Sequence, residues 1–458
     1  MKWNRIMIAA PKSGSGKTTI TCALLQALKE TGQSVVSYKC GPDYIDPMFH
    51  QKVIDVPAKN LDTFFTDEET TRRLFLKNRK ESEFAVLEGV MGLYDGLGGV
   101  REEGSSYHLA AVTKTPIILI VDTKGMGRSV IPMISGFLTY DKEKLIKGVI
   151  LNRMSKAYYE TIKPLIEKEL PIKVLGFFPD NKEIHMGSRH LGLLMPDEIC
   201  DIKEQLQKLS DQLQKTVLLE SILQIAEQAE EINCEERLPN VAEDAAIRPV
   251  IAVAKDEAFC FYYEDNLQLL KEYGAEIRYF SPLYDSGLPE GCSGVLLGGG
   301  YPELYADKLS QNRDMICAIK DAAENHMPIV AECGGFMYLH STIMDQEERP
   351  HIMIGIVPAR CYNTGKLVRF GYIELEGTKD SFLPKGERIR GHEFHYYDSE
   401  ENGSDCWAVK PVTGKRYPCF IENENLFAGF PHLYYASNSA FAENFVKKAR
   451  KYKERKAL

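Results

Sequence analysis

The sequence predicts an α/β protein with two domains, an N-terminal P-loop domain built on a parallel sheet and a second α/β domain after it. At 458 residues the chain is too long for one ordinary core, since domains of roughly 100–200 residues are usual. Short apolar runs alternate with longer amphipathic runs in both halves. This alternation is typical of buried strands covered by helices.

The first strand–helix series occupies the N-terminal half. The run 17–30 has helical periodicity, and short runs that are apolar on both faces predict buried parallel strands. Polar, helix-forming sequence from about 197 to 231 closes this half, with leucines at helical spacing. The expected strands are 5–9, 34–38, 84–87, 116–121, 147–151 and 174–178.

An acidic stretch without apolar periodicity, at about 228–248, separates the two halves. Such composition is typical of a linker. The second series begins at 249–254, with further strands expected at 276–280, 294–297 and 328–331 and several more in the last third. The expected domains are residues 1–235 and 249–458, joined by a linker at 236–248.

Composition excludes several classes of protein. The net charge of -9 argues against generic nucleic-acid binding, because phosphates attract a basic face. No apolar stretch approaches the ~18 residues of a membrane span, and the N-terminus lacks the apolar region of a signal peptide. The 11 cysteines include no C-x-x-C pair, which favours reduced thiols. We therefore expect a cytoplasmic protein without nucleic-acid or membrane partners.

A phosphate-binding loop follows the first expected strand. Residues 10–19 read APKSGSGKTT and open the first expected helix. Backbone N–H groups around Gly14 and Gly16 can wrap a phosphate, and the helix N-terminus adds positive potential. Lys17 would reach the β- and γ-phosphates, and the Thr18 hydroxyl would ligate Mg²⁺.

The loop departs from the usual pattern at one position. Pro11 stands where the first glycine is expected. Lys12 lies five residues before Lys17, as in the deviant loops of the dethiobiotin synthetase and partition-ATPase group. A plain glycine-rich turn between strand and helix is the alternative. The expected nucleotide contacts are Lys12, Gly14, Gly16, Lys17, Thr18, Thr19 and Asn152.

Acidic side chains gather where the next two strands end. Asp43 and Asp46 lie on the turn GPDYIDP, Glu88 ends the following strand, and Asp95 comes in a glycine-rich loop. Carboxyl ends of parallel strands meet at the ligand crevice, and Mg²⁺ prefers oxygen ligands. We therefore predict one Mg²⁺ held by Thr18, Asp43 and Glu88. For each acid alone, a solvated loop carboxylate is the alternative.

Three further polar residues are weaker candidates. Asn152 ends the expected strand GVILN and could hydrogen-bond a nucleobase, although a cap or turn role is nearly as good an interpretation. Arg189 and His190, in GSRHLGL, could meet an anionic substrate. Nothing else in the sequence decides their roles.

The second half carries a candidate nucleophile. Cys333 stands between an expected strand and a helix start, in AECGGFMYL. The glycines after it permit a tight turn, and the helix N-terminus is expected to lower the thiol pKa and favour the reactive thiolate. Upstream, Gly299 and Gly300 of GGGYPE offer backbone N–H groups for an oxyanion. A buried structural cysteine is the alternative.

A thiolate nucleophile needs a base. His432, in GFPHLY, lies far downstream of Cys333, as expected of a partner that only folding brings close. His392 and His395, in RGHEFHYY, are the competing candidates.

Together these segments resemble the class I glutamine amidotransferases of the cobyrinic acid a,c-diamide synthase and cobyric acid synthase group, over essentially the whole chain. The N-terminal resemblance rests on SGSGKTT, GPDYIDP, EGVMGLYDG and SRHLGL, and the C-terminal one on GGGYPE, AECGGFMYL, RFGY, RGHEFHY and the final histidine segment. GPDYIDP and GHEFHY are specific to the a,c-diamide synthase branch. The resemblance implies a dethiobiotin-synthetase-like ATP domain followed by a class I glutamine amidotransferase α/β domain.

The resemblance also implies roles for single residues. Cys333 is similar to the glutaminase nucleophile and His432 to its base. Related amidotransferases often complete a triad with Glu two residues after the histidine; here that residue is Tyr434, as in the cobyrinate branch, so a Cys–His dyad is expected. His392 and His395 stay without a role. The residues that match metal-binding and amidation positions are Asp43, Tyr44, Asp46, Glu88 and Asp95.

The activity that the resemblance implies is ATP- and glutamine-dependent amidation, with Mg²⁺, of the a and c acetates of cobyrinic acid in cobalamin biosynthesis. Nickel-sirohydrochlorin a,c-diamide synthesis has the same chemistry and remains an alternative; GPDYIDP argues against cobyric acid synthase. A partition-type ATPase without amidase activity is the alternative from another class, but it would have no use for Cys333 and His432. Deviant phosphate loops often lie near dimer interfaces, so a homodimer is an option.

Overall fold

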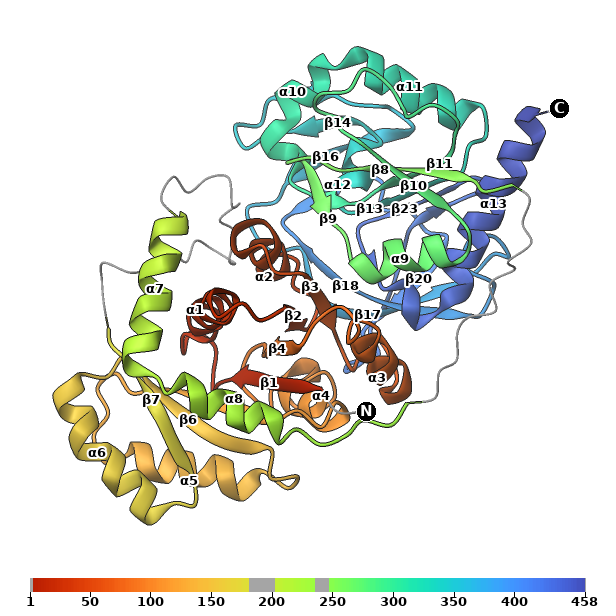
Figure 1. Ribbon diagram of the computed structural model, residues 1–458. Helices are drawn as coiled ribbons and strands as arrows, with labels where there is room; N and C mark the ends of the chain where they lie inside the picture. Colours follow the sequence, from red (N-terminus) through yellow and green to blue (C-terminus); the bar gives the residue numbers. More distant parts are fainter. Residues whose placement is uncertain (1–2, 181–201, 235–246, 458) are drawn as a thin grey trace. The chain divides into compact units, whose positions relative to one another are not determined.

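The computed structural model describes residues 3–180, 202–234 and 247–457. The chain divides into two units, Met1–Glu236 and Arg237–Leu458. Each unit has its own sheets and its own apolar clusters, so each is described by itself. The ribbon is drawn in Figure 1.

The first unit contains a seven-stranded sheet in the order β3-β2-β4-β1-β5-β6-β7. Every neighbouring pair is parallel. The strands are β1 (Asn4–Ala9), β2 (Val35–Cys40), β3 (Ala58–Leu61), β4 (Phe84–Glu88), β5 (Ile117–Asp122), β6 (Ile146–Asn152) and β7 (Lys173–Phe178). The six strands expected in this half are therefore confirmed to within a residue or two, and the parallel sheet with them.

Strand β3 was not predicted. Its four residues, AKNL, alternate small, charged and polar side chains, which gives no apolar run to recognise. It occupies the edge of the sheet beside β2, where one side has no neighbouring strand to select for a continuous apolar sequence.

Helices cover both faces of this sheet (Figure 1). Alternate residues of β1 belong to two different apolar clusters, Met7 to one and Ile6 to the other, because successive side chains of a strand point to opposite faces. Helix α1 matches the expected run and lies beside α7. The helical elements are α1 (Lys17–Glu30), α2 (Ile45–Phe49), the π-helical turn η1 (His50–Ile54), α3 (Glu68–Leu76), α4 (Ser106–Val112), α5 (Val130–Tyr140), α6 (Lys156–Glu169), α7 (Ile202–Thr216) and α8 (Leu219–Glu227).

The second unit is built on a six-stranded sheet in the order β10-β8-β11-β13-β23-β22. All of its neighbouring pairs are parallel except β22–β23. The strands are β8 (Val250–Ala254), β10 (Glu276–Phe280), β11 (Cys292–Leu297), β13 (Ile329–Glu332), β22 (Ile421–Glu422) and β23 (Leu426–Gly429). The four strands expected individually in this half are all present.

The last third of the chain adds further β-structure, as expected. A five-stranded antiparallel sheet has the order β21-β20-β17-β18-β24, and a four-stranded sheet the order β15-β14-β16-β19. The antiparallel sheet comprises β17 (Arg369–Gly377), β18 (Arg388–His395), β20 (Cys406–Val409), β21 (Arg416–Cys419) and β24 (His432–Leu433). The four-stranded sheet comprises β14 (His340–Met344), β15 (Pro350–Ile352), β16 (Val357–Asn363) and β19 (Tyr397–Ser399).

The remaining elements of the second unit are short strands and helices. Two strands, β9 (Phe259–Phe261) and β12 (Gly299–Gly300), pair antiparallel. The helices are α9 (Glu264–Glu272), α10 (Ala306–Gln311), α11 (Arg313–Glu324), α12 (Gly334–Tyr338) and α13 (Ser439–Ala457).

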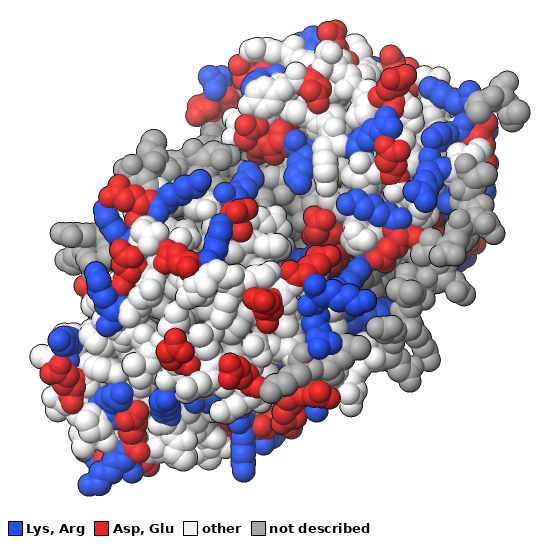
Figure 2. Space-filling model, viewed as in Figure 1, with Lys and Arg blue, Asp and Glu red and all other residues white. Residues whose placement is uncertain are grey.

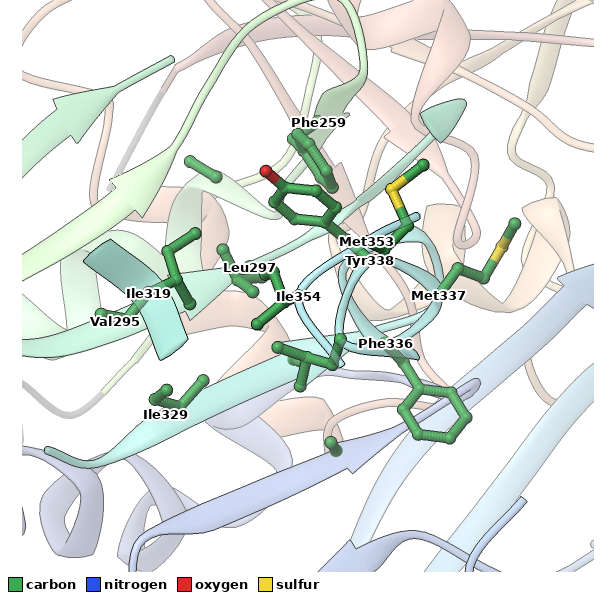
Figure 3. Close-up of a cluster of buried hydrophobic side chains, with 14 of the residues drawn as sticks. Phe259, Val295, Leu297, Ile319, Ile329, Phe336, Met337, Tyr338, Met353 and Ile354 are labelled. Carbon is green, nitrogen blue, oxygen red and sulfur yellow. The ribbon is translucent and has the colours of Figure 1, made fainter. Parts of the chain in front are cut away.

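Helix α12 is anchored in a buried apolar cluster of this unit (Figure 3). Phe336 and Tyr338 are fully buried and come from the turn of chain that follows β13. They pack with Phe259, Leu297 and Ile354. The cluster therefore holds the start of α12 against the sheet.

Charged side chains of both signs are interspersed on the face drawn in Figure 2, where Lys and Arg side chains lie among Asp and Glu side chains. None of the helices in the described ranges combines the length and the apolarity that crossing a membrane requires.

Phe336→Ala should destabilise the second unit by about 3–5 kcal/mol, because it removes a fully buried ring and leaves a cavity. Urea unfolding followed by circular dichroism measures the effect. Ile352→Ala is the control, since Ile352 is 56% exposed and its truncation should cost less than about 0.5 kcal/mol. Equal effects of the two substitutions would contradict the packing described for α12.

Candidate functional site

The phosphate-binding loop joins β1 to α1 through left-handed backbone. Gly14 has φ 73° and Gly16 φ 91°, a region that side chains disfavour. A β-carbon on Gly16 would lie 2.3 Å from Nδ2 of Asn152. That amide donates to the carbonyl of Ser15 at 2.8 Å. Asn152 therefore braces the loop from the end of β6, and only glycine fits beside it.

Lys17 is buried at the start of α1. Its Nζ donates to the carbonyl of Met91 at 2.6 Å and lies 3.4 Å from that of Lys12. Burial, followed by the nearby Lys39, lowers the pKa of Lys17 to about 8. Bound anionic groups would favour its charged form.

The loop after β4 lies beside the phosphate-binding loop. Leu93 donates its backbone N–H to the carbonyl of Ala10 at 2.8 Å. Within that loop, Asp95 Oδ2 accepts from the N–H of Gly92 at 2.9 Å. Asp95 thus fixes the loop that supplies the Met91 carbonyl to Lys17.

A buried charge cluster lies at the carboxyl ends of β2 and β4. Lys39 Nζ contacts both Asp46 and Glu88 Oε1, the latter at 2.8 Å, and lies 3.9 Å from Asp43 Oδ2. Thr18 Oγ1 donates to Glu88 Oε1 at 2.6 Å and is 3.5 Å from Asp46 Oδ2. Because Glu88 is fully buried and Lys39 nearly so, these charges depend on one another.

The cluster sets the protonation of its carboxyl groups. Burial raises the pKa of Glu88 to about 7, although Lys39 opposes this. Burial and the neighbouring Asp46 raise the pKa of Asp43 to about 7. For Asp46, Lys39 outweighs burial and lowers the pKa to about 2. Asp46 is thus the carboxylate that stays ionised beside the ammonium.

His50 lies beside the Glu88 oxygen that does not contact Lys39 or Thr18. Its Nε2 lies 3.6 Å from Glu88 Oε2, and its Nδ1 is hydrogen-bonded to Ser37 Oγ at 2.9 Å. Burial lowers the pKa of His50 to about 4, so this ring is neutral at neutral pH. Glu88 Oε2 has no hydrogen-bond partner among the described residues.

The expected metal-binding residues are partly brought together. Thr18 and Glu88 are in contact, whereas Asp43 Oδ1 accepts from the N–H of Ile45 at 2.8 Å and Asp46 lies nearer to Thr18. Across the described ranges, no group of three or more His, Cys, Asp and Glu side chains is arranged to hold a metal ion. Tyr44 is buried at the N-terminus of α2.

The other residues predicted from the sequence lie in the phosphate-binding loop and α1 or outside the described ranges. Lys12 is exposed, whereas Thr19 lies half-buried in the first turn of α1. Arg189 and His190 lie outside the described residues.

Lys39 and His50 were not predicted from the sequence. Lys39 was detectable, because it is a charged residue inside the run VVSYKC, whose residues are all buried. His50 gave no such signal.

In the second unit, Cys333 forms the turn between β13 and α12. It has φ 49° and ψ −105°, a conformation that non-glycine residues rarely adopt. Its N–H donates to the carbonyl of Gly429 at 2.9 Å, and the N–H of Gly335 donates to the carbonyl of Gly298 at 2.9 Å. These bonds tie the strained turn to the neighbouring strands.

The pKa of the Cys333 thiol differs from the expected one. Burial, followed by the nearby Glu303, raises its pKa to about 12, although the N–H of Gly334 acts in the opposite direction. The expectation of a lowered pKa was therefore wrong. Helix α12 has only five residues, and desolvation of the thiolate outweighs its N-terminus.

His432 lies at the start of β24, beside the glycine loop. A β-carbon on Gly299 would lie 2.4 Å from His432 Cε1, so the ring packs directly on the Gly299 backbone. Burial, followed by His395, lowers the pKa of His432 to about 3. The imidazole is therefore neutral and able to accept a proton.

Gly299 and Gly300 form β12, next to the Cys333 turn. A β-carbon on Gly334 would lie 3.1 Å from the backbone N of Gly300. The turn that carries Cys333 and the loop that contacts His432 are thus adjacent. This is the arrangement that an oxyanion hole beside a nucleophile requires.

The GHEFHY segment contacts His432 through His392. The ring of His392 stacks on that of His432, with centroids 5.0 Å apart, and is hydrogen-bonded to Tyr263 Oη at 3.1 Å. His395 stacks on Phe430 at 4.2 Å. Tyr434 Oη donates to Asp265 Oδ2 at 2.9 Å.

Family models match both units. The "CobQ/CobB/MinD/ParA nucleotide binding domain" matches residues 6–193, and the "CobB/CobQ-like glutamine amidotransferase domain" matches residues 250–440. A nucleotide-binding domain followed by a glutamine amidotransferase domain defines a class of amide-forming ligases.

Curated relatives match nearly the full chain. A cobyrinate a,c-diamide synthase of Caldanaerobacter subterraneus subsp. tengcongensis is 39% identical, covering 93% of this chain and 94% of its own. One of Listeria innocua serovar 6a is 39% identical, with coverage of 95% and 97%, and one of Priestia megaterium is 35% identical over 100% of both chains. The chain belongs to the cobyrinate a,c-diamide synthase family.

Lys39→Met should destabilise the first unit by about 3–5 kcal/mol, because it leaves the buried carboxyl groups without their cation. The loss should be smaller at pH 5 than at pH 8, since Glu88, with a pKa of about 7, is protonated at the lower pH. Urea unfolding at the two pH values measures both effects.

The matched control for this change is Lys29→Met. Lys29 pairs with Asp55 at 2.9 Å with side-chain exposures of 41% and 88%, and such surface pairs contribute at most about 1 kcal/mol. If both variants lost the same stability, the buried cluster would not depend on Lys39.

The raised pKa predicts slow alkylation of Cys333 in the glutamine-free protein. Its rate with iodoacetamide should rise about tenfold per pH unit from 7 to 9.5, because the thiolate fraction grows until pH reaches the thiol pKa of about 12. Peptide mapping by mass spectrometry measures it, with exposed Cys317 as the internal reference. A rate that levels off below pH 9 would contradict the buried, protonated thiol.

Proposed function

We propose that this protein amidates the a and c acetate side chains of cobyrinic acid, using ATP to activate each carboxylate and glutamine as the source of ammonia. The observation that carries the proposal is the strained turn at Cys333, beside the Gly299–Gly300 loop on which His432 packs. The names of the full-length relatives support the substrate. Residues 1–235 are the ATP-dependent synthetase domain, 236–248 the linker and 249–458 the amidotransferase domain.

The first unit would transfer the γ-phosphoryl group of ATP to a substrate carboxylate oxygen. The products are an acyl phosphate and ADP, and the step depends on positioning and charge neutralisation. Lys17 would meet the β- and γ-phosphates in place of its present partners, the Met91 and Lys12 carbonyls. Lys12, Gly14, Gly16, Thr19 and Asn152 form the rest of the nucleotide site.

A Mg²⁺ ion fits the oxygen atoms that surround Thr18. Such an ion usually takes one or two protein ligands and the phosphate oxygens, and the Thr18 hydroxyl and Glu88 Oε1, which are in contact, offer these. Thr18, Asp43 and Glu88 remain the proposed ligands. Bound there, the ion would neutralise charge on the phosphates.

The charged residues of GPDYIDP and of the loop after β4 would contact the macrocycle and the carboxylate that is amidated. Lys39 holds Asp46 and Glu88 at the carboxyl ends of β2 and β4, where Glu88 contacts Thr18 of the phosphate-binding loop. Asp43, Tyr44, Asp46, Glu88 and Asp95 are therefore the proposed substrate and amidation residues. Ammonia attacks the acyl carbon, the C–O bond to phosphate breaks, and phosphate leaves.

The second unit would supply that ammonia. His432, neutral at rest, accepts the thiol proton as Cys333 Sγ attacks the side-chain amide carbon of glutamine. The N–H groups of Gly299 and Gly300 stabilise the oxyanion, joined by the N–H of Gly334, which points at Sγ. His432 then protonates the departing ammonia and activates the water that releases glutamate. The pair of Cys333 thiolate and His432 imidazolium is buried and unfavourable alone, so it would form only when glutamine is bound.

The location and assembly follow the same reasoning. All cysteines in the described part of the chain are free thiols, which supports a reducing, cytoplasmic compartment. A homodimer fits the deviant type of phosphate loop that Lys12 marks.

Cys333→Ser should lose glutamine-dependent amidation by on the order of 10³-fold or more yet retain amidation with ammonium salts. Lys17→Ala should lose both activities, because ATP activation precedes either donor. Mass spectrometry of products from cobyrinic acid with Mg-ATP measures both, each amidation replacing one hydroxyl by one amino group, twice.

Two results would overturn the assignment. Equal loss with glutamine and ammonium in Cys333→Ser would remove the division of labour between the units. Double amidation of nickel-sirohydrochlorin but not cobyrinic acid would assign the other macrocycle.

A further inference from the structure

A buried acid lies directly before the nucleophile and has no role so far. Glu332 ends β13, immediately before Cys333, and is 5% exposed. Its Oε2 lies 4.0 Å from His432 Nδ1. A carboxylate on the Nδ1 side of a catalytic base is where serine and cysteine triads keep their third member, because it leaves Nε2 to face the nucleophile.

The residue that could have supplied this acid from the histidine's own strand is engaged elsewhere. Tyr434 is two residues after His432 and directs its hydroxyl to Asp265. Its side chain is therefore not the partner of the base. An acid 4.0 Å from the base comes instead from the end of β13.

The ring of His432 is held in one orientation. The Gly299 backbone packs against its Cε1 atom, with Nδ1 3.2 Å from a β-carbon built on Gly299. The ring of His392 stacks on one face at an interplanar angle of 17°. The Gly299 backbone and the His392 ring thus hold one edge and one face of the imidazole, whose Nδ1 lies 4.0 Å from Glu332 Oε2.

The carboxyl group of Glu332 is oriented as well. Its Oε1 is 3.4 Å from the donating hydroxyl of Tyr435, and the backbone N–H of Leu433 also binds the carboxyl group. Both donors belong to the segment that carries His432. Glu332 is thus hydrogen-bonded to the segment of the base by Leu433 and Tyr435, and its Oε2 lies 4.0 Å from the ring.

We propose that Glu332 is a positioning residue for His432 and completes a Cys–His–Glu triad whose acid comes from the strand of the nucleophile. This inference rests on the proposed glutaminase activity of the second unit. Glutamine binding would shorten the 4.0 Å separation to a hydrogen bond, as catalytic hydrogen bonds often tighten only in the substrate complex. The ionised carboxylate then stabilises the imidazolium that forms when Cys333 loses its proton.

A purely structural role predicts different behaviour. Burial raises the pKa of Glu332 to about 8, so a neutral carboxyl that only filled space would be replaced by an amide without effect on chemistry. The titratable groups that face Glu332 are Tyr262, Cys333, His432 and Tyr435. Among them Cys333 and His432 change charge in the proposed reaction; an ionised Glu332 favours the imidazolium of His432 and opposes the thiolate of Cys333.

The test is Glu332→Gln, with Glu422→Gln as the matched control. Glu422 is also a buried acid of this unit, 1% exposed, and bonds the N–H of Phe382, away from the base. Glu332→Gln should lower kcat for glutamine hydrolysis by about 10²-fold, the scale of a general-base contribution, with KM little changed. Glu422→Gln should leave kcat unchanged. Amidation driven by ammonium salts should be the same in both variants and the wild type.

The pH profile separates positioning from support of the fold. In the wild type, kcat/KM for glutamine should inflect near 8, the pKa of Glu332, and the inflection should vanish in Glu332→Gln. Glu332→Asp should restore part of kcat. The wild-type fold should lose stability as pH rises from about 4.5 toward 8, because the raised pKa keeps the buried Glu332 protonated while the unfolded chain ionises. Glu332→Gln should escape this loss.

The outcomes are distinguishable. Wild-type kcat and an unchanged profile in Glu332→Gln would overturn the triad while leaving the proposed function intact. A wild-type protein that hydrolyses no glutamine would overturn the proposed function itself. Loss of kcat together with loss of ammonium-driven amidation and of the folded state would overturn the positioning role in favour of a structural one.

Discussion

Both units depend on one constraint, which is that a parallel strand must turn sharply at its carboxyl end before the next helix can pack on the sheet. In the first unit, glycines with positive φ make this turn and leave their N–H groups open to a phosphate. In the second unit Cys333 itself takes a positive φ, 49°, without being a glycine. That conformation costs about 1–3 kcal/mol, which the bonds to Gly429 and Gly298 and the cluster around Phe336 offset.

A second physical theme is that burial opposes charge on the reactive groups. Burial lowers the pKa values of Lys17 and His432 and raises that of Cys333. Cys333 and His432 would become charged only against each other, whereas Lys17, with a pKa of about 8, is mostly charged at neutral pH and a bound phosphate would favour that form further. Lys39 is the exception, since Asp46 and Glu88 overcome burial and keep its pKa well above the ordinary value.

The sequence predicted most of this architecture because its signals are local. Buried parallel strands are continuous apolar runs, and the phosphate loop is one contiguous motif placed between a strand and a helix. What it missed depends on the fold. Strand β3 has no apolar run. Lys39 matters because folding brings it to carboxylates on β4 and α2. His50 matters because it lies beside Glu88. The thiol pKa was predicted in the wrong direction because a motif shows the helix N-terminus but not the desolvation around it.

No glutamate follows His432 on its own strand. The third residue of a triad can instead come from another strand that ends near the histidine. Strand β13 lies next to β23, and their paired residues run as far as Glu332 and Gly429. His432 follows β23 by three residues. The acid at the end of β13 has its Oε2 4.0 Å from Nδ1 of this histidine. Because carboxyl ends of parallel strands converge, a catalytic position can be filled from either strand, and Glu332, rather than an empty third position, is the consequence that the geometry favours.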